Sequence, residues 1–327
     1  MARITYREAI SQALREEMRR DERVFIMGEE VGVWGGSYAV TRGFLDEFGE
    51  KRVKDTPIAE SVIAGAATGA AIAGLRPIAE IMTINFAFLA LDQIVNHAAK
   101  LHYMFNGQIK VPLVIRTVGG GGRQLAATHS QTPDVIFAYF PGLKVVAPGT
   151  PADAKGLLKS AIRDDDPVFF IEHATLYSVR GEVPDDEDYL VPIGVSDIKR
   201  PGKDVTLVSY SKMIQTTLEA ADKLAEQGVD AEVIDLRSLR PLDIQPVIES
   251  VKKTNRLVVI EEGWRSFGIG AEISSTVAEL AFDYLDAPIR RVAQAEVPLP
   301  YNKRLEQLAL PQVDDVIKAA KDVLYLK

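Results

Sequence analysis

The sequence predicts two α/β domains, each built on a parallel β-sheet, because short apolar segments alternate with amphipathic ones twice along the chain. In the first half, strands are expected at Val24–Gly28, Pro77–Met82, Val111–Thr117, Leu143–Ala147 and Pro167–Glu172. Helical patterns lie between them at 88–104 and 150–163. The second of these opens with an N-cap threonine, a proline and an acid in the first turn. Such alternation is typical of a parallel sheet that is covered on both faces.

Residues 181–203 differ from the segments on either side, since they combine acids with three prolines and three glycines. This composition predicts a surface linker. The alternation then resumes, with strands expected at 204–209, 231–236, 257–261 and 289–292 and helices at 213–227, 269–280 and from 313 onward. We therefore expect a first domain at 1–180, a linker at 181–203 and a second domain at 204–327.

Composition narrows the classes of function. The 327 residues are 47% hydrophobic and 26% charged, which is enough apolar material for a full core. A net charge of −8 argues against nucleic acid as a partner and allows a basic protein partner. The absence of cysteine excludes disulfides, thiolate metal sites and cysteine nucleophiles.

No membrane span or targeting segment is expected. The uncharged segment Val62–Leu75 is shorter than the roughly 20 apolar residues that a membrane helix needs, so a buried helix is the better interpretation. The first 21 residues are charged throughout and predict an amphipathic helix instead of a signal peptide. A cytoplasmic location is expected.

Glu60 stands at the head of this uncharged segment and has two interpretations. Thr56 and Pro57 suit a helix start, and an acid in a first turn favours the positive end of the helix dipole. However, residues 65–74 contain three glycines and several alanines, which leave a helix face with almost no side chain. Such a face suits close packing of another backbone. Glu60 would then lie beside an interface, in dry surroundings where a carboxylate can share a proton with a ligand base.

A glycine-rich segment, Gly119–Arg123, directly follows an expected strand. It could cradle an anion or form a flexible active-site loop, and the chain has no G-x-G-x-x-G or Walker A motif. His129 follows this segment, in a position where loops often carry function, although a structural role stays open. Structural interpretations also fit the other histidines, His97, His102 and His173. No histidine pair has helical metal-binding spacing, so a metal cage made by protein alone is not expected.

Eight segments occur in the same order in one known family. They are GEEVGVWGGSYAVTRGF (28–44), DTPIAE (55–60), GLRPIAEIMTINF (74–86), THSQ (128–131), PGLKVV (141–146), DAKGLLKSAIRDDDPV (153–168), IEEGWRSFGIGAEI (260–273) and DAPIRRVAQAEVPLPY (286–301). On these segments the chain resembles the beta subunits of the thiamine-diphosphate-dependent 2-oxoacid dehydrogenases, from about residue 4 to its end. The resemblance is closest to the decarboxylating component of pyruvate dehydrogenase.

The resemblance implies a pyrimidine-binding thiamine-diphosphate fold followed by a transketolase C-terminal-type domain. It also implies a heterotetramer of two alpha and two beta subunits that is active only when complete. The reaction would be oxidative decarboxylation of pyruvate, with acetyl transfer to the lipoyl group of a dihydrolipoyl transacetylase core. Branched-chain 2-oxoacids and acetoin remain alternative substrates, because residues 86–92 fit no branch of the family perfectly and Gly119–Arg123 lies in a variable region. A non-catalytic scaffold subunit is a further alternative.

Residue roles follow from the same resemblance. Glu60 would hydrogen-bond a ring nitrogen of the cofactor's aminopyrimidine. His129 would position the substrate and the lipoyl group and manage protons. Phe86, Glu29 and Ile58 would lie around the cofactor. For Phe86 a core aromatic is the alternative interpretation, and for Glu29 a solvated or capping acid.

The resemblance also predicts what this chain lacks. Family members hold the diphosphate through Mg²⁺ with a Gly-Asp-Gly motif, which does not occur here. The alpha subunit should therefore supply Mg²⁺ and the diphosphate half of the site. A structural K⁺ is expected at backbone carbonyls near the end of the 150–163 helix, where helical carbonyls lack partners. The implied ligands are Leu113, Ala161, Ile162, Asp164 and Asp166.

Overall fold

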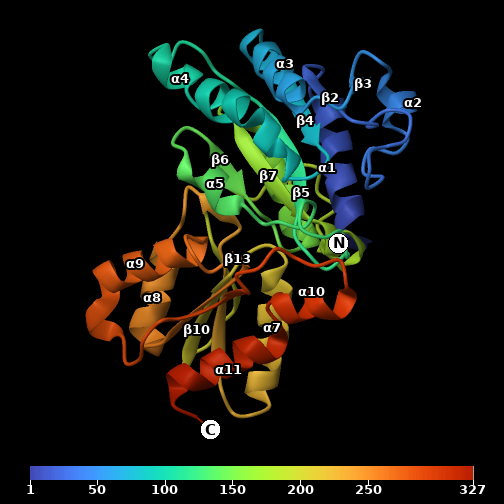
Figure 1. The fold of residues 1–327 in the computed structure, drawn as a ribbon. Helices are drawn as coiled ribbons and strands as arrows, with labels where there is room; N and C mark the ends of the chain where they lie inside the picture. The colour runs from blue at the N-terminus through green and yellow to red at the C-terminus, as the bar shows by residue number, and fades with distance from the viewer. Residues whose placement is uncertain (327) are drawn as a thin grey trace. The chain divides into compact units, whose positions relative to one another are not determined.

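The computed structural model describes residues 1–326 and divides the chain into two compact units. Unit 1 comprises residues 1–119 and 136–193, and unit 2 comprises residues 120–135 and the chain from Gly194 onward (Figure 1). The segment 120–135, expected in the first domain, thus belongs to unit 2. The segment 181–203 is more than a linker, because it contains β8 (Arg180–Val183) in part and all of β9 (Asp197–Arg200).

Unit 1 is built on a parallel sheet. Its strands follow the order β6 (Lys144–Val146), β7 (Val168–His173), β5 (Val114–Gly119), β4 (Arg76–Ile81), β2 (Val24–Gly28) and β3 (Val53–Asp55). Each neighbouring pair in this order is parallel. The five predicted strands of this half are confirmed, whereas the short β3 and the antiparallel pair β1 (Ala2–Thr5) and β8 were not predicted. Parallel strands bring their carboxyl ends, and the loops that follow them, to one edge.

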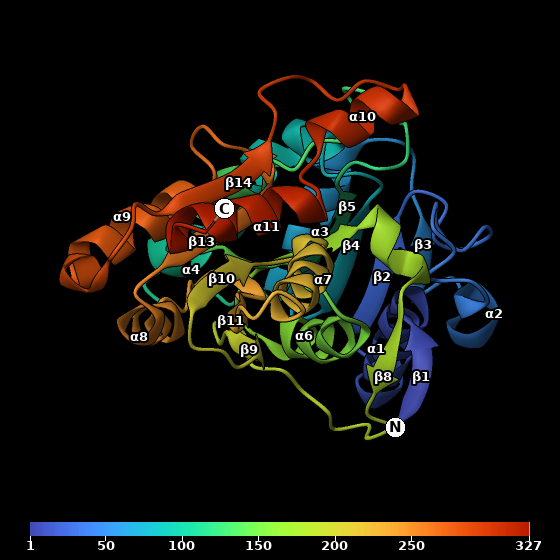
Figure 2. The ribbon, with the colours of Figure 1, turned by 90° about the horizontal axis from the view of Figure 1, so that it is seen from below.

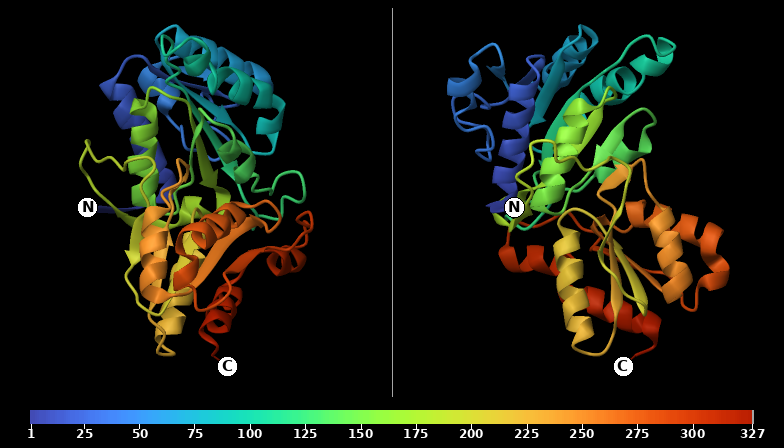
Figure 3. Two further views of the ribbon diagram at one scale, coloured as in Figure 1. Left: turned by 90° about the vertical axis from the view of Figure 1, so that its left-hand side faces the viewer. Right: turned by 180° about the vertical axis from the view of Figure 1, so that it is seen from behind.

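Helices cover both faces of this sheet. On one face lie α1 (Tyr6–Arg20) and α6 (Pro151–Arg163), which pack against each other and share an apolar core with the strands (Figure 3). On the other face lie α3 (Glu60–Ile72) and three short helical segments, of which the first two pack against α3. These are η1 (Phe86–Ala90), η2 (Gln93–Ala98) and α4 (Leu101–Met104), which stand where one helix at 88–104 was predicted. Two further short helices are α2 (Phe44–Phe48) and α5 (Asp134–Tyr139).

The expectation that the segment after Glu60 is buried is only half correct. The face of α3 that carries Ile63, Ala64 and Ala67 is buried, but Ala66 and Gly69 are exposed. A Cβ added at Gly69 would meet no atom within 4 Å. The exposed face of α3 therefore carries Ala66 and Gly69 together with the larger Val62 and Ile72.

Unit 2 has a sheet of five strands with helices on both faces. The order is β14 (Arg290–Gln294), β13 (Leu257–Trp264), β10 (Val205–Ser209), β11 (Ala231–Asp235) and β9. The first four are parallel, and β9 is antiparallel to β11. One face is covered by α7 (Met213–Ala225) and α11 (Val313–Leu324), the other by α8 (Gln245–Thr254) and α9 (Ile269–Ala281) (Figure 2). The predicted elements are confirmed, while α8, α10 (Lys303–Ala309), β9 and β12 (Ser238–Arg240) were not predicted.

A buried ion-pair network ties three neighbouring strands of unit 1 together. Arg116 of β5 is only 1% exposed, and its guanidinium pairs with Glu80 on β4 and Glu172 on β7. The hydroxyl of Tyr177 donates a hydrogen bond of 2.6 Å to Glu172. A buried charge is tolerated only when it is paired and hydrogen-bonded, so the three charged groups depend on one another.

We predict that Arg116→Met lowers the free energy of unfolding by about 3–5 kcal/mol, because it leaves two buried carboxylates without their cation. Urea unfolding of the full chain, followed by circular dichroism, measures this loss. The matched control is Lys223→Met, since Lys223 pairs with Glu219 at the surface, where the two side chains are 45% and 60% exposed, and its removal should change little. Equal midpoints for the two variants would contradict the role given to the network.

Candidate active site

Two acids lie at the carboxyl edge of the unit 1 sheet, after neighbouring strands. Glu29 directly follows β2, and Glu60 is the first residue of α3, which follows β3. Both side chains are buried, with 4% of each exposed. No described residue hydrogen-bonds the Glu29 carboxylate, and both of its oxygens are buried. Buried carboxylate oxygens without donors are costly, so this edge is built to meet a hydrogen-bond donor from outside the described chain.

The surroundings of Glu29 disfavour its charge. Burial is the main cause, and the nearby charges of Glu60 and Glu80 add to it; together they raise the pKa of Glu29. Glu80 stands opposite Gly28 in the β2–β4 register and is held by Arg116. The ion-pair network inside the sheet therefore contributes to the electrostatics of the acids at its edge.

The loop that carries Glu29 is fixed by the end of the neighbouring strand. Asp55, the last residue of β3, accepts hydrogen bonds from the backbone N–H groups of Gly32 at 2.6 Å and Val33 at 3.2 Å. Asp55 belongs to the segment that leads into Glu60. One carboxylate thus connects the loop after β2 to the chain before α3, and so ties together the two segments that hold the acids.

Apolar side chains accompany the acids at this edge. Phe86 follows β4 and begins η1, where it is half-buried. Ile58 lies two positions before Glu60 and is 78% exposed, which is unusual for a residue of this kind. An exposed isoleucine and a half-buried phenylalanine provide apolar surface next to acceptors, as a flat heterocyclic ring requires.

The helix-dipole interpretation of Glu60 also has structural content. Glu60 lies in the first turn of α3, and the N-cap residue, Ala59, offers no side-chain cap. An acid at this position stabilises the helix whether or not a ligand is bound. The two interpretations are compatible, because a residue in the first turn of a helix can stabilise that helix and also contact a ligand.

The carbonyl groups predicted to bind K⁺ lie at the opposite, amino edge of the same sheet. They belong to Leu113 before β5 and to Ala161, Ile162, Asp164 and Asp166 around the end of α6. Arg76 donates hydrogen bonds to the carbonyl oxygens of Ile162 at 3.0 Å and Asp164 at 2.8 Å. The carboxylates of Asp164 and Asp166 contact Lys144. Two of the predicted carbonyls and both carboxylates therefore already contact a positively charged side chain.

In unit 2, the glycine-rich segment does cradle an anion, and the anion is a side chain of the chain itself. The carboxylate of Glu306 on α10 accepts hydrogen bonds from the N–H of Gly122 at 3.0 Å and of Gln124 at 3.2 Å. The side-chain amide of Gln124 adds a bond of 2.7 Å. Glu262 on β13 accepts from the N–H of Gly121 at 2.7 Å. This segment is therefore not available as a phosphate cradle.

His129 lies on the exposed part of the same loop in unit 2. Its Nδ1 lies 2.9 Å from the hydroxyl of Thr128, and its backbone N–H donates to the carbonyl of Ala126 at 3.3 Å. Ala126 and Gln124 both have positive φ, at +65° and +56°, so the loop is tightly wound before the histidine. The imidazole is thus presented at the surface of unit 2 by a defined backbone.

The structural interpretations of the other histidines fit their contacts. His97 and His102 are exposed and contact the backbone carbonyls of Asp92 and Ile109. His173 is buried at the end of β7 and accepts a hydrogen bond from the N–H of Thr175.

Residues 1–326 contain no cluster of three or more His, Cys, Asp or Glu suited to a metal ion. Over the same range, every helix is too short or too polar to cross a membrane.

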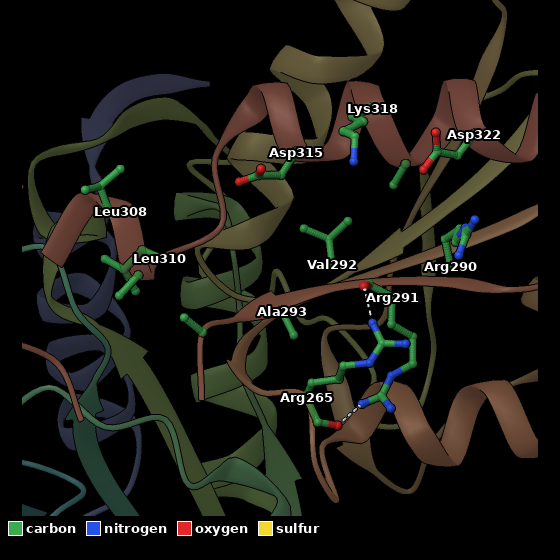
Figure 4. Close-up of a pocket in the computed structure, with 13 residues that line it drawn as sticks. Arg265, Arg290, Arg291, Val292, Ala293, Leu308, Leu310, Asp315, Lys318 and Asp322 are labelled. Atoms are coloured by element: carbon green, nitrogen blue, oxygen red, sulfur yellow. Dashed lines mark hydrogen bonds between the residues drawn. The ribbon is translucent and has the colours of Figure 1, made fainter. Parts of the chain in front are cut away.

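A cleft of about 390 Å³ opens in unit 2 between β14 and α11 (Figure 4). Its lining includes the positively charged side chains of Arg265, Arg290 and Lys318 and the negatively charged ones of Asp315 and Asp322. Two of the arginines are engaged with each other's backbone, as the dashed lines in Figure 4 show. None of the residues predicted for catalysis, cofactor binding or metal binding lines this cleft.

Several residues of functional interest were missed by sequence reasoning. Asp55 and Glu262 lie inside segments that carry the family resemblance, so a search for acids at strand ends could have found them. Arg116 could have been noticed as a lone charge within an apolar strand. Glu306 had no such signal, because its partners are 182 to 184 residues away.

Comparisons with known proteins agree with this architecture. Residues 2–179 match the family model "Transketolase, pyrimidine binding domain", and residues 194–316 match "Transketolase, C-terminal domain". Among solved structures, a "Split gene transketolase, inactive beta4 tetramer" superposes with a TM-score of 0.81 at 25% identity, covering 100% of both chains.

Curated relatives share the whole length of the chain. The pyruvate dehydrogenase E1 component subunit beta of Rhizobium meliloti is 53% identical over 99% of this chain and 71% of its own length. That of Rickettsia felis is 53% identical over 98% of both chains, and the mitochondrial protein of Dictyostelium discoideum is 50% identical over 98% of this chain and 91% of its own. With both domain models matched in order, the chain belongs to the family of pyruvate dehydrogenase E1 component beta subunits.

Proposed function

We propose that the chain, together with an alpha subunit, decarboxylates pyruvate and transfers the acetyl group to a lipoyl group of a transacetylase. The observation that carries this proposal is the pair of buried acids, Glu29 and Glu60, at the carboxyl edge of the pyrimidine-binding unit. Family membership supports a thiamine-diphosphate-dependent 2-oxoacid dehydrogenase component.

The residues at this edge fit the aminopyrimidine end of thiamine diphosphate. When bound, the cofactor supplies a carbon nucleophile and an electron sink for decarboxylation. Glu60 would hold a proton between its carboxylate and a ring nitrogen. Phe86 and Ile58 would pack on the ring. Glu29, whose oxygens have no hydrogen-bond partner among the described residues, would act through Glu60. Burial, with the nearby charges of Glu60 and Glu80, raises the pKa of Glu29, so this acid holds its proton more tightly than an exposed glutamate does.

The other half of the site would come from the alpha subunit. The chain has no Gly-Asp-Gly motif, and the backbone amides of its glycine-rich loop are taken by Glu262 and Glu306. Mg²⁺ and the diphosphate are therefore assigned to the partner. The exposed face of α3 suits packing of that partner in a heterotetramer of two alpha and two beta subunits.

His129 would act in the second half of the reaction. It is exposed, and an imidazole can pass a proton, which a lipoyl sulfur must receive as the dithiolane opens. The acidic balance of the chain suits a transacetylase whose binding module is basic. The possession of both Glu60 and His129 favours a catalytic subunit over a scaffold, and a cytoplasmic location belongs to the same proposal.

K⁺ at the amino edge of the unit 1 sheet also stays a proposal. A carbonyl oxygen has two lone pairs, so Ile162 and Asp164 can accept from Arg76 and still ligate a monovalent cation. Leu113, Ala161 and Asp166 would complete the set. The role of such an ion would be structural, since this edge is opposite to the one that carries Glu60.

The decisive experiment reconstitutes the chain with its alpha subunit and measures two reactions, decarboxylation with an artificial electron acceptor and acetylation of a lipoyl domain. We expect pyruvate to be used faster than branched-chain 2-oxoacids or acetoin.

Glu60→Gln should lower both reactions by about 10²–10⁴-fold, because Glu60 acts before the two reactions diverge. His129→Ala should lower lipoyl acetylation by a larger factor than the acceptor reaction.

Glu279→Gln is the matched control for these variants, since Glu279 is an exposed acid on α9. If another oxoacid is used faster than pyruvate, the proposed substrate is wrong. If Glu60→Gln keeps wild-type rates, Glu60 only stabilises its helix. Equal losses in the two assays would restrict His129 to substrate binding.

The pKa shift of Glu29 gives a pH-dependent prediction for the chain without cofactor. Its folded pKa is raised, so the folded state loses stability as pH rises from the ordinary glutamate pKa, roughly 4.3, through the raised value, and this loss persists at neutral pH. Glu29→Gln should therefore be more stable than the wild type at pH 7, with a gain that vanishes on acidification. Denaturant unfolding over a pH series measures this, and a pH-independent difference would contradict it.

A further inference from the structure

The loop between β5 and α5 is anchored from one end by two acids of unit 2. Glu306 is fully buried, and its carboxylate receives two backbone N–H groups and one side-chain amide from residues 122–124. Glu262, also buried, receives the N–H of Gly121. A carboxylate surrounded by several N–H donors forms the stronger class of hydrogen bond, so these contacts fix the backbone where the loop begins.

Packing reinforces this anchor. A Cβ at Gly121 would lie 2.7 Å from a methyl group of Leu299 and 3.0 Å from one of Leu310, so a larger residue here would require these leucine side chains to move. α10, which carries Glu306, is itself capped by Asn302. Its last residue, Ala309, accepts the backbone N–H of Ala295 at 2.9 Å. Glu306 is thus presented by a segment that is fixed at both of its ends.

The loop closes on itself between the anchor and His129. The N–H of Gly120 donates to the carbonyl of Gln131 at 3.2 Å, and the side chain of Gln131 donates to the carbonyl of Ala127 at 3.2 Å. The N–H of His129 bonds to Ala126 within this closed loop. With both ends of the loop joined, the backbone fixed by Glu306 is the same rigid piece that carries the imidazole.

From this geometry we infer that Glu306 is a positioning residue for His129, acting through the backbone of residues 121–126. The effect of Glu306 on catalysis rests on the proposed function, whereas its effect on the loop backbone does not. Without the carboxylate, the N–H groups of Gly122 and Gln124 lose their acceptor, and the histidine loses its fixed place on unit 2.

The structural part is tested by hydrogen exchange of the full chain, read by mass spectrometry over residues 121–131. Glu306→Gln keeps the side-chain size but replaces one acceptor oxygen by a donor. We expect exchange in this peptide to speed up by about tenfold or more. Gln124→Ala, which removes an exposed side chain with one bond to Glu306, should give a smaller change in the same direction. Glu279→Gln should leave the peptide unchanged.

The functional part is a double-mutant cycle on the reconstituted tetramer. Glu306→Gln should lower lipoyl acetylation by about tenfold in the wild type, and by less than about twofold when His129 is already alanine, because the two act as one unit. Equal losses in both backgrounds would overturn the inference and make Glu306 a general structural residue. Unchanged exchange over residues 121–131 would overturn it as well. If the wild-type tetramer acts on no 2-oxoacid, the proposed function fails, while the exchange arm still decides whether Glu306 holds the loop.

Discussion

The placement of charge in unit 1 depends on one buried guanidinium. Arg116 lies in the middle strand of three and holds Glu80 on one side and Glu172 on the other. Glu80 is in turn opposite the residue before Glu29, and its charge contributes to the raised pKa of Glu29. The acids at the edge of the sheet are therefore not independent surface groups. Burial and the charge of Glu60 raise the pKa of Glu29 most, and Glu80 of the ion-pair network adds to them from within the sheet.

The backbone donors of the glycine-rich segment are used internally. Backbone N–H groups in glycine-rich loops commonly bind phosphates, yet here the donors of residues 121–124 are satisfied by Glu262 and Glu306. What remains open at the unit 1 edge is a set of acceptors, which suits the N–H groups and protonated nitrogens of a heterocycle but repels a diphosphate. The polarity of the site thus supports the proposal that a second subunit binds the diphosphate.

Much of the fold was predictable because apolar strands and capped helices have local signatures. β2 coincides with its predicted range, and α6 begins after Thr150, whose side chain caps it as expected. Elements without such signatures were missed: β3 is three residues long and mostly charged, and β9 lies in a segment whose prolines and glycines indicated a linker. The single helix expected at 88–104 is divided among 3₁₀, π and α turns, which share one apolar pattern and cannot be told apart by periodicity.

The site divides in the same way. Glu60 could be proposed from the sequence because it heads an uncharged segment of small residues, and His129 because it follows a glycine-rich loop after a predicted strand; both also lie in family segments. The residues that set their environment could not, since Arg116 needs two partners from other strands and Glu306 contacts a loop more than 180 residues away. Long-range neighbours of this kind become visible only when the sheet and the loop are folded.

The claim that this chain supplies one half of a shared cofactor site can be tested by calorimetric titration with thiamine diphosphate and Mg²⁺. The chain alone should bind the cofactor at least about 100-fold more weakly than the chain mixed with its alpha subunit, because the charged contacts to the diphosphate are missing. Mg²⁺-dependent binding by the chain alone, as tight as that of the mixture, would contradict the account.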